Sequence, residues 1–489
     1  MNTTENKTEA TRTESDSLGS RQVPADAYYG IQALRASENF PISGFRPKDL
    51  YPELPVCLGW IKKAAAQTNM AAGVLDPDDS ERNQKIGNAI LRACDELIAG
   101  DFDDQFIVDP WQGGTGTSHH MNANEILANR ATELLGGERG QFNTPNAVHP
   151  NDHVNYGQST NDVMPTAIRL MVLGGHPHLE NAVNHLIRVW EERATTFKHV
   201  VIPGRTHMQD AVPMTAGQLF NGYATQLVHC LASLEAAIGP LYGMSLGGTA
   251  VGTGLNTAPG YRKTVVETLC KITEWPLYAV DDYFAATSSF LEFSGYSAAM
   301  RQLALALEKQ AQDLKLYSSG PMTMVGDLKL PQLQPGSSIM PGKVNPVMPE
   351  LMNQISYAVQ GNDLSISLAV QNGQLQLNVM MPLLLIKLSE SQKLLTNSLR
   401  VFTDTCVAGL AVNETGVKHK LDRSAVLVTA LNPTIGYEAA AKVAKLVMSE
   451  NKTVHQAVLE LGITDHHGCV LNETRLNELL SPDSMVTVD

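Results

Sequence analysis

The stretch GSSIMPGKVNP, residues 336–346, interrupts a chain that otherwise has mainly helical patterns. Two serines follow a glycine, a Pro-Gly pair comes next, and Lys343 and Asn345 lie close together. Proline inside a helix costs about 3 kcal/mol or more, so we expect no helix through this stretch. Its serines, lysine and asparagine are therefore placed on a loop.

This loop is part of a longer segment, residues 318–349, that is rich in proline and glycine throughout. Irregular segments of this length are uncommon in compact domains, and most are either functional or disordered. We favour a functional loop over disorder and over an inert connector, because the segment also carries apolar residues that can anchor it. These residues are Ile339, Met340, Val344 and Val347.

The sequence on either side of the segment predicts long helices. Residues 216–241 and 382–410 are long and apolar-periodic, and the region before residue 318 carries a seam of apolar residues in alternating steps of four and three. The seam residues are Met300, Ala304, Leu307, Ala311 and Leu314. Strand patterns are short and confined to residues 20–30, 200–206 and 210–215. The fold class is therefore mostly α, with a long helix bundle.

Composition limits the function classes. The chain has 489 residues, enough for about three domains, and no apolar run of the roughly 18 residues that a membrane span needs. A formal charge of −14 disfavours nucleic acid as a partner. The six cysteines show no framework spacing and the start of the chain is polar, so we expect a cytoplasmic protein with reduced thiols. Residues 1–15 are expected to form a disordered tail.

Four further stretches, residues 113–122, 149–162, 204–211 and 247–256, concentrate hydroxyl, amide, imidazole and glycine residues. Each has a structural explanation as helix caps or surface polar groups. The glycines of the last stretch lack the strand–turn–helix context of a nucleotide loop, and the paired histidines lack the spacing of metal ligands. We therefore expect neither cofactor nor metal. Taken together, the clusters suit hydrogen bonding to a small dicarboxylate.

The motifs GSSIMPGKVNP, HPNDHVN, QSTND, GRTHMQDA and GGTAVGTGLN resemble those of the aspartase/fumarase superfamily. The resemblance runs from about residue 16 to the C-terminus. It implies a three-domain fold: a mainly helical N-terminal domain (residues 16–157), a central long-helix bundle (158–414) and a small C-terminal helical domain (415–489). It also implies a homotetramer with a helical core, in which three subunits build each active site.

Within the superfamily the sequence most resembles the aspartate ammonia-lyases. Fumarases typically carry Trp-Gly where Tyr29 and Gly30 stand, and glutamine at the position of Ser118. Two departures are His120, in place of a common asparagine, and Met381, where aspartases often have glutamate. The resemblance implies reversible deamination of L-aspartate to fumarate and ammonia. The alternatives are a class II fumarate hydratase, a lyase acting on a substituted aspartate, and a non-catalytic structural relative.

The resemblance also implies roles for individual residues. Ser337 is the base, Lys343 helps to stabilise its alkoxide, and Glu350 orients the ring of His207. The residues implied to bind substrate are Thr117, Ser118, Ser159, Thr160, Asn161, Thr206, His207, Ser338, Lys343 and Asn345. A second carboxylate site near the entrance is implied at His149, Asn151 and Asp152.

Overall fold

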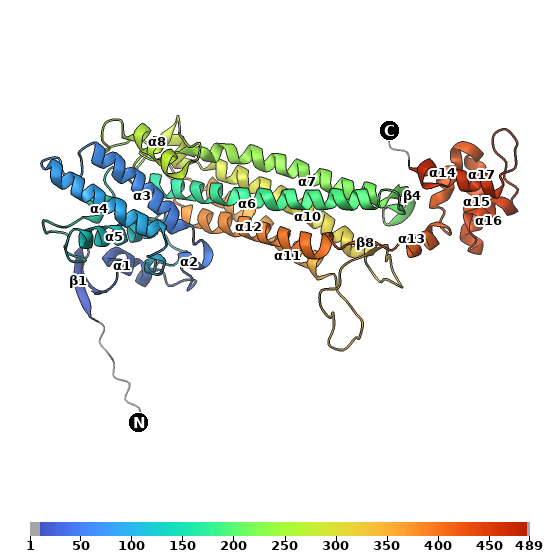
Figure 1. Ribbon diagram of the computed structural model, residues 1–489, viewed down its shortest axis with the longest axis horizontal. Helices are drawn as coiled ribbons and strands as arrows, with labels where there is room; N and C mark the ends of the chain where they lie inside the picture. The colour runs from blue at the N-terminus through green and yellow to red at the C-terminus, as the bar shows by residue number, and fades with distance from the viewer. Residues whose placement is uncertain (1–9, 487–489) are drawn as a thin grey trace, which may run out of the picture. The chain divides into compact units, whose positions relative to one another are not determined.

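A computed structural model describes residues 10–486 of the chain (Figure 1). The chain divides into two compact units, each assembled from three separate stretches. The described residues of unit 1 come from Met1–Pro177, Ser233–Arg301 and Ala358–Leu394. Those of unit 2 come from His178–Ala232, Gln302–Tyr357 and Leu395–Asp489. The predicted domain boundaries at residues 157/158 and 414/415 stay predictions.

Long helices dominate the structure, which confirms the mostly α fold class. They are α6 (Thr160–Thr196), α7 (Ala216–Ile238), α10 (Leu291–Tyr317), α11 (Val347–Gln371) and α12 (Met381–Phe402). The predicted seam on α10 is buried: its residues from Met300 to Leu314 have no exposed surface. Within the described part of the chain, no helix is both long enough and apolar enough to cross a bilayer.

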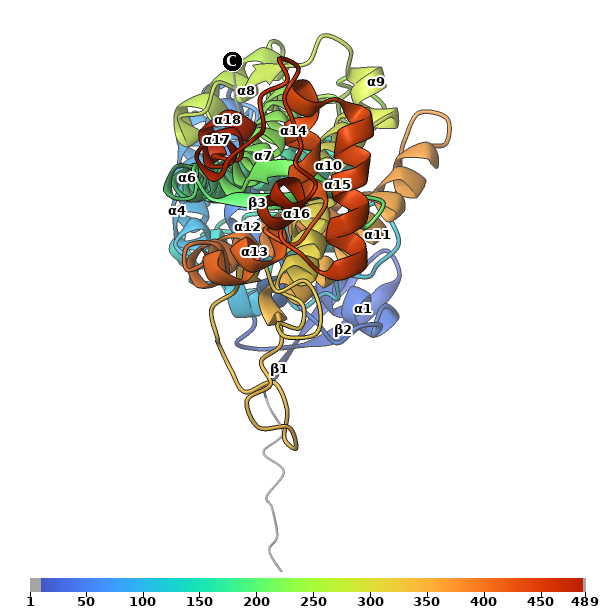
Figure 2. The same ribbon diagram turned by 90° about the vertical axis from the view of Figure 1, so that its right-hand side faces the viewer.

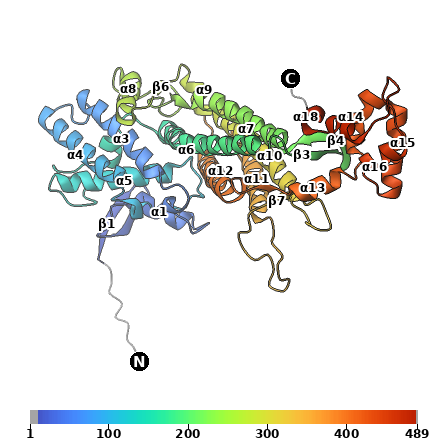
Figure 3. The same ribbon diagram turned by 45° about the vertical axis from the view of Figure 1, so that its right-hand side comes forward.

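Shorter helices complete unit 1. They are α1 (Ile31–Asn39), α2 (Pro47–Leu50), α3 (Leu54–Ala71), α4 (Ser80–Ile98), α5 (Thr117–Leu134), α8 (Tyr261–Thr273) and α9 (Tyr283–Ser288). Helix α3 packs against α4 and α8, and α4 packs against α5; Figure 3 shows α3, α4 and α5 side by side. Leu58, Ile61 and Ala65 of α3 are fully buried by this packing.

Six short helices follow at the C-terminal end of unit 2. They are α13 (Glu414–Leu421), α14 (Val426–Ile435), α15 (Tyr437–Glu450), α16 (Val454–Glu460), α17 (Glu473–Leu479) and α18 (Pro482–Met485). Helix α14 packs on α15, and α15 on α16 (Figure 2). Helices α13 and α14 also contact a hairpin of two strands in the same unit, which is described below.

Over residues 10–486 the strands form four two-stranded sheets. Three are antiparallel: β1 (Thr11–Asp16) with β2 (Gly19–Pro24), β3 (Val201–Thr206) with β4 (Gln209–Thr215), and β7 (Leu328–Lys329) with β8 (Ala411–Val412). The fourth pairs β5 (Gly243–Met244) with β6 (Tyr278–Ala279) in parallel. The strands predicted at residues 200–206 and 210–215 are confirmed as β3 and β4, whereas the one predicted at residues 20–30 is confirmed only up to Pro24, as β2.

Strand β1 shows that the prediction of a disordered tail over residues 1–15 is wrong for residues 11–15. The Arg12 guanidinium explains the order, since it donates to the backbone carbonyls of Pro24, Ala27 and Tyr29 at 2.7–2.9 Å. The Glu14 carboxylate accepts a hydrogen bond from the Ile31 N–H at 2.9 Å. The polar composition of residues 1–15 could not show that Arg12 and Glu14 have these hydrogen-bond partners. Residues 1–9 of the predicted tail lie outside the described residues.

The segment between α10 and α11 is a long loop, drawn in yellow-brown in Figure 1. Apart from the two-residue strand β7 it has no regular structure up to residue 346, as predicted. Helix α11 begins at Val347, so residues 347–349 of the predicted interruption are helical. The expected apolar anchoring is wrong for a single chain. Ile339 is 82% exposed and Met340 47% exposed, so neither is buried by its own chain.

Candidate functional site

The predicted site residues fall into two groups, and each group lies within one unit. The unit 1 group contains Thr117, Ser118, His149, Asn151, Asp152, Ser159, Thr160 and Asn161. The unit 2 group contains Thr206, His207, Ser337, Ser338, Lys343, Asn345 and Glu350.

A glycine-rich turn places Thr117 at the N-terminus of α5. Gly114, Thr115 and Gly116 have φ values of 83°, 68° and 91°, a left-handed run that glycine adopts without strain. Thr117 is exposed and Ser118 is half-buried. The first N–H groups of a helix lack intrahelical partners and carry partial positive charge, so this end of α5 favours an anion.

The N-terminus of α6 carries Ser159, Thr160 and Asn161. The Ser159 hydroxyl accepts a hydrogen bond from the Asn161 N–H at 3.2 Å, which is the cap that the sequence also allowed. The Asn161 amide donates to the Ala250 carbonyl at 2.7 Å. These residues are therefore both helix-end groups and candidates for ligand binding.

Asp162, for which no role was predicted from the sequence, holds the N-terminus of α6 in place. Its fully buried carboxylate accepts hydrogen bonds from the backbone N–H groups of Ser159, Gly247 and Thr249 at 2.9–3.0 Å. Burial raises the pKa of Asp162 to about 6, although the three N–H donors oppose the rise. The glycine stretch at residues 247–256 is thus a loop that folds onto the start of α6.

Thr160 contacts a second group, of which only His120 was singled out from the sequence, and then only as a departure from the superfamily pattern. Its hydroxyl oxygen lies 2.9 Å from Nδ1 of His120, and Nε2 of His120 lies 2.7 Å from the ammonium nitrogen of Lys62. Lys62 and His120 are both buried. Nothing local in the sequence marks this burial, because Lys62 stands beside Lys63 in a lysine pair.

A cavity of about 720 Å³ opens beside the start of α6 in unit 1. Its lining includes Ser159, Thr249 and Asn256, and also Asn151 and Asp152 of the predicted second carboxylate site. His149 has a different position: its Nδ1 accepts hydrogen bonds from the N–H groups of Asn151 and Asp152 at 3.2 and 3.1 Å. His149 therefore caps the π-helical turn Pro150–Val154, and a ligand role for it stays a prediction.

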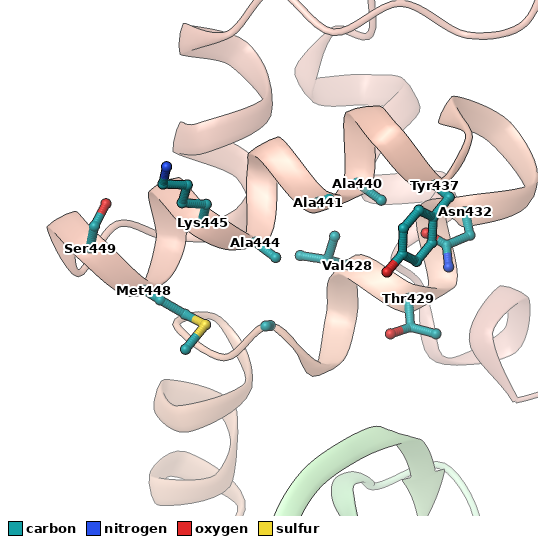
Figure 4. A pocket seen from close by; sticks show the side chains of 11 residues that line it. Val428, Thr429, Asn432, Tyr437, Ala440, Ala441, Ala444, Lys445, Met448 and Ser449 are labelled. Carbon is teal, nitrogen blue, oxygen red and sulfur yellow. The ribbon is translucent and has the colours of Figure 1, made fainter.

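A second cavity, of about 650 Å³, lies between α14 and α15 in unit 2 (Figure 4). Val428, Ala440, Ala441 and Ala444 give it a largely apolar wall, and Lys445 is its one charged lining residue. None of the predicted site residues lines it. Its chemistry does not match the hydroxyl- and amide-rich set expected for a dicarboxylate.

In unit 2 the hairpin β3–β4 presents Thr206 and His207 at its tip. Thr206 pairs with Gln209, so His207 and Met208 form a two-residue turn with φ values of 53° and 61°. Such turns favour Asn-Gly, because L side chains in the left-handed region cost about 1–2 kcal/mol per residue. His207 is exposed and held in a strained conformation, as functional residues often are.

Replacing Met208 with glycine is expected to stabilise the protein by about 1 kcal/mol, because glycine removes the strain at a positive φ. The shift in urea midpoint at fixed protein concentration measures the effect. Met322→Gly is the matched control, since Met322 is 91% exposed and its φ lies outside the left-handed region. We expect the control to be neutral or slightly destabilising; a loss of stability in Met208→Gly would contradict the strain argument.

The base of the hairpin is anchored by a buried carboxylate. Asp327 has no exposed surface and pairs with Arg205 at 2.7 Å and with Lys420 at 2.6 Å. Because Arg205 directly precedes Thr206, this ion pair restrains the backbone that carries the predicted binding residues.

The loop at residues 336–346 closes on itself. The Gly336 N–H donates to the Lys343 carbonyl at 2.8 Å, and the Asn345 amide donates to the Gly336 carbonyl at 3.0 Å. A Cβ atom at Gly336 would lie 2.7 Å from the Lys343 carbonyl oxygen, so this closure needs glycine. The closure brings Lys343 and Asn345 together, with their side chains 2.7 Å apart.

Ser337 lies at the start of this closed loop. Its hydroxyl oxygen accepts hydrogen bonds from the backbone N–H groups of Ile339 and Met340 at 3.2 and 3.1 Å. Two donors aimed at one oxygen stabilise negative charge on it. Ser338, Lys343 and Glu350 are exposed. Within the described residues of one chain, no hydrogen bond or ion pair joins Glu350 to His207. The predicted pairing of those two residues is not formed within one chain.

Comparison with protein families gives two matches. The family described as "Lyase" matches residues 19–361, and the family described as "Fumarase C C-terminus" matches residues 427–487. Together the matches take in the residues of both groups.

Individual relatives agree with the family matches. Aspartate ammonia-lyase of Bacillus sp is 43% identical over 474 residues, which is 97% of each chain. Fumarate hydratase class II of Halobacterium salinarum is 44% identical over 479 residues, again 97% of each chain. A crystal structure of fumarate lyase:delta crystallin from Brucella melitensis superposes with a TM-score of 0.89 at 41% identity, covering 97% of this chain and 99% of that one.

Proposed function

Because this chain belongs to the aspartase/fumarase superfamily of lyases, we propose that it is an ammonia-lyase that converts L-aspartate reversibly to fumarate and ammonia. One observation carries the chemistry: the Ser337 hydroxyl oxygen accepts hydrogen bonds from two backbone N–H groups. The same loop also carries Lys343 and Asn345. The choice of an amine over water rests on the aspartase-like residues Tyr29 and Ser118.

The reaction begins with removal of a proton from the carbon next to one carboxylate. That proton is weakly acidic, because its loss makes a dianionic aci-carboxylate, so donors must be in place where the charge develops. Ser337 acts as an alkoxide base and takes the proton. The N–H groups of Ile339 and Met340 stabilise the alkoxide before the transfer, and Lys343 adds positive charge in the same loop.

The second step breaks the carbon–nitrogen bond. The electron pair of the aci-carboxylate forms the carbon–carbon double bond of fumarate as the amine leaves. An ammonium group departs as neutral ammonia, so no separate acid is required. Closure of a loop over the substrate excludes water and strengthens the electrostatic interactions with the intermediate.

The two carboxylates of the substrate have separate partners in this proposal. Thr117, Ser159, Thr160 and Ser338 hold the carboxylate on which charge develops. The partners of the other carboxylate are Thr206, His207, Lys343 and Asn345. Asn161, with Thr117 and His207, faces the amino group.

We further propose that the chain works as a homotetramer in which each site draws residues from three copies. Helix α11 supports association, because Tyr357, Leu364 and Leu368 recur at helical spacing and are 52%, 62% and 48% exposed. An apolar helix face of this kind is covered in a stable protein. The exposed Ile339, and the lack of a Glu350–His207 pair within the described residues of one chain, also fit partners supplied by other copies.

A reducing compartment fits the cysteines, since all six are unpaired and four are buried. We therefore propose a cytoplasmic enzyme whose partners are a small dicarboxylate and further copies of itself.

Fumarate hydratase activity is the second candidate, and the Halobacterium salinarum relative favours it specifically. A substituted aspartate is the third, because His120 and Met381 depart from the superfamily pattern.

An absorbance assay separates these functions. We expect the ultraviolet absorbance of fumarate to rise when L-aspartate is added to the purified protein, and to rise at least about tenfold more slowly with L-malate. A signal with L-malate alone would overturn the ammonia-lyase assignment in favour of the hydratase. A signal with neither substrate would favour a substituted aspartate.

A further inference from the structure

Lys62 is a cation held entirely inside unit 1. Its ammonium nitrogen has three neutral acceptors: Nε2 of His120 at 2.7 Å, Oδ1 of Asn155 at 3.0 Å and Oε1 of Gln158 at 2.9 Å. An ammonium group has three N–H donors and no acceptor. These partners therefore match the charged form of Lys62 one for one.

This arrangement fixes the tautomer of His120. Burial and the neighbouring Lys62 ammonium hold the pKa of His120 well below its usual value, and a hydrogen bond with the Asn155 side chain opposes the fall only in part, so the ring is neutral and carries one N–H. Because the Lys62 ammonium can only donate, Nε2 of His120 must accept through its lone pair. The single ring hydrogen is therefore on Nδ1. The Nδ1–H then donates to the Thr160 hydroxyl oxygen at 2.9 Å.

The hydroxyl hydrogen of Thr160 is consequently left without a protein acceptor. Apart from His120, no residue within the described part of the chain accepts a hydrogen bond from this hydroxyl. Thr160 is buried except for 8% of its surface and lies at the N-terminus of α6, where an anion is favoured. Its hydroxyl is thus arranged as a donor for a ligand.

We propose that Lys62 and His120 are positioning residues that orient the Thr160 hydroxyl toward a bound carboxylate, and that a proton is held on Lys62 when the carboxylate binds. The proposal rests on the proposed function in one respect, that Thr160 touches the carboxylate of a dicarboxylate substrate. It also identifies a source of positive charge near the unit 1 group in a protein with a net charge of −14.

The protonation state of Lys62 controls the direction of this chain of hydrogen bonds. Burial lowers the pKa of Lys62 to about 7, and the Asp162 carboxylate of α6 opposes the lowering only in part. The Cys94 thiol of α4 also faces this region, but burial raises its pKa, so it is uncharged near neutral pH. A neutral amine can accept from Nε2–H of His120. Nδ1 then becomes an acceptor, and the Thr160 hydroxyl turns toward it and away from the ligand.

Binding and protonation are therefore linked. A carboxylate that needs the Thr160 donor binds better when Lys62 is charged, so binding raises the affinity of Lys62 for its proton. As pH rises through about 7, the free protein loses this proton and the apparent affinity for a dicarboxylate falls.

Calorimetric titration with succinate, an unreactive dicarboxylate, tests the linkage in the full-length protein. The dependence of the measured heat on buffer ionisation enthalpy gives the protons taken up on binding. At about pH 7.5 we expect the unchanged protein to take up about half a proton per site. The proton uptake should disappear in Lys62→Met, and the affinity should fall at least about tenfold.

A matched pair at His120 keeps the test decisive if Lys62→Met fails to fold. His120→Asn retains one acceptor and one donor, and we expect succinate affinity within about threefold of the unchanged protein. His120→Leu retains neither and should lose at least about tenfold together with the proton uptake. His207 is unchanged in all variants, so its contribution to succinate binding is the same on both sides of each comparison.

Three outcomes would overturn the proposal. Equal proton uptake by the unchanged protein and by His120→Leu would show that succinate binding is not linked to the protonation of Lys62 through His120. Equal loss of affinity in the Asn and Leu variants would assign His120 a packing role alone. Absence of succinate binding by the unchanged protein would overturn the proposed function as well, whereas the first two outcomes leave that function standing.

Discussion

Replacing Ser337 with alanine is expected to lower the rate of fumarate formation from L-aspartate by about 10³-fold or more. The variant retains the loop and its backbone donors but has no atom to take the proton from carbon. Binding groups elsewhere are unchanged, so the dicarboxylate still binds and the loss falls on kcat. Steady-state absorbance assays at several L-aspartate concentrations separate kcat from KM.

Ser338→Ala is the matched control, because it removes the adjacent and exposed hydroxyl from the same loop. By its proposed role it contributes one hydrogen bond to a carboxylate, so we expect a loss of about tenfold, well below that of Ser337→Ala. Circular dichroism and size-exclusion chromatography should show both variants folded and assembled like the unchanged protein. Near-normal turnover in Ser337→Ala would refute the assignment of the base.

Replacing Asp162 with alanine is expected to lower the free energy of unfolding by about 3–6 kcal/mol. The change removes the acceptor of three backbone N–H groups, those of Ser159, Gly247 and Thr249. The N–H groups of Gly247 and Thr249 are buried, and each costs about 1–3 kcal/mol when left without a partner, whereas the part-buried Ser159 N–H loses less because water can reach it. Urea denaturation at a fixed protein concentration measures the loss, since assembly makes apparent stability depend on concentration.

Asp282→Ala supplies the comparison for this prediction. Asp282 also accepts two backbone N–H groups, from Phe284 and Ala285 at 2.8 and 3.0 Å, but it is exposed at the start of α9. Water replaces its carboxylate, so we expect a loss of only about 1 kcal/mol. If Asp162→Ala cost no more than this control, the hydrogen bonds from Gly247 and Thr249 would not be what holds the loop to α6.

Local patterns were sufficient to predict the elements that depend on local physics. The buried seam on α10, the helix α7 and the absence of helix through residues 336–346 follow from side-chain periodicity and from the covalent constraints of proline. The loop was also identifiable as the place for Ser337, Lys343 and Asn345. The prediction of disorder was wrong for residues 11–15, because Arg12 donates hydrogen bonds to carbonyls more than ten residues away in sequence.

The site motifs were visible in sequence, but the partners of their residues were not. His149 is a residue type that often binds ligands, but here its side chain caps a helical turn. Asp162 is part of the motif QSTND, yet no role was predicted for it from the sequence. Lys62 was hidden because nothing local distinguishes a buried lysine from an exposed one in a lysine pair. Its partner His120 lies 58 positions away in the sequence, so their contact could not be predicted from local patterns.

The amino-acid sequence by itself determined the helical fold class, the superfamily resemblance and the residue types available for binding a dicarboxylate. Only the tertiary structure decided which donors face which acceptors: two N–H groups on Ser337, three on Asp162, and the orientation of Thr160 through His120 and Lys62. The physical reason is that helix periodicity and proline effects act within a few residues. Hydrogen-bond direction and the pKa of a buried group depend instead on neighbours that folding brings from distant parts of the chain.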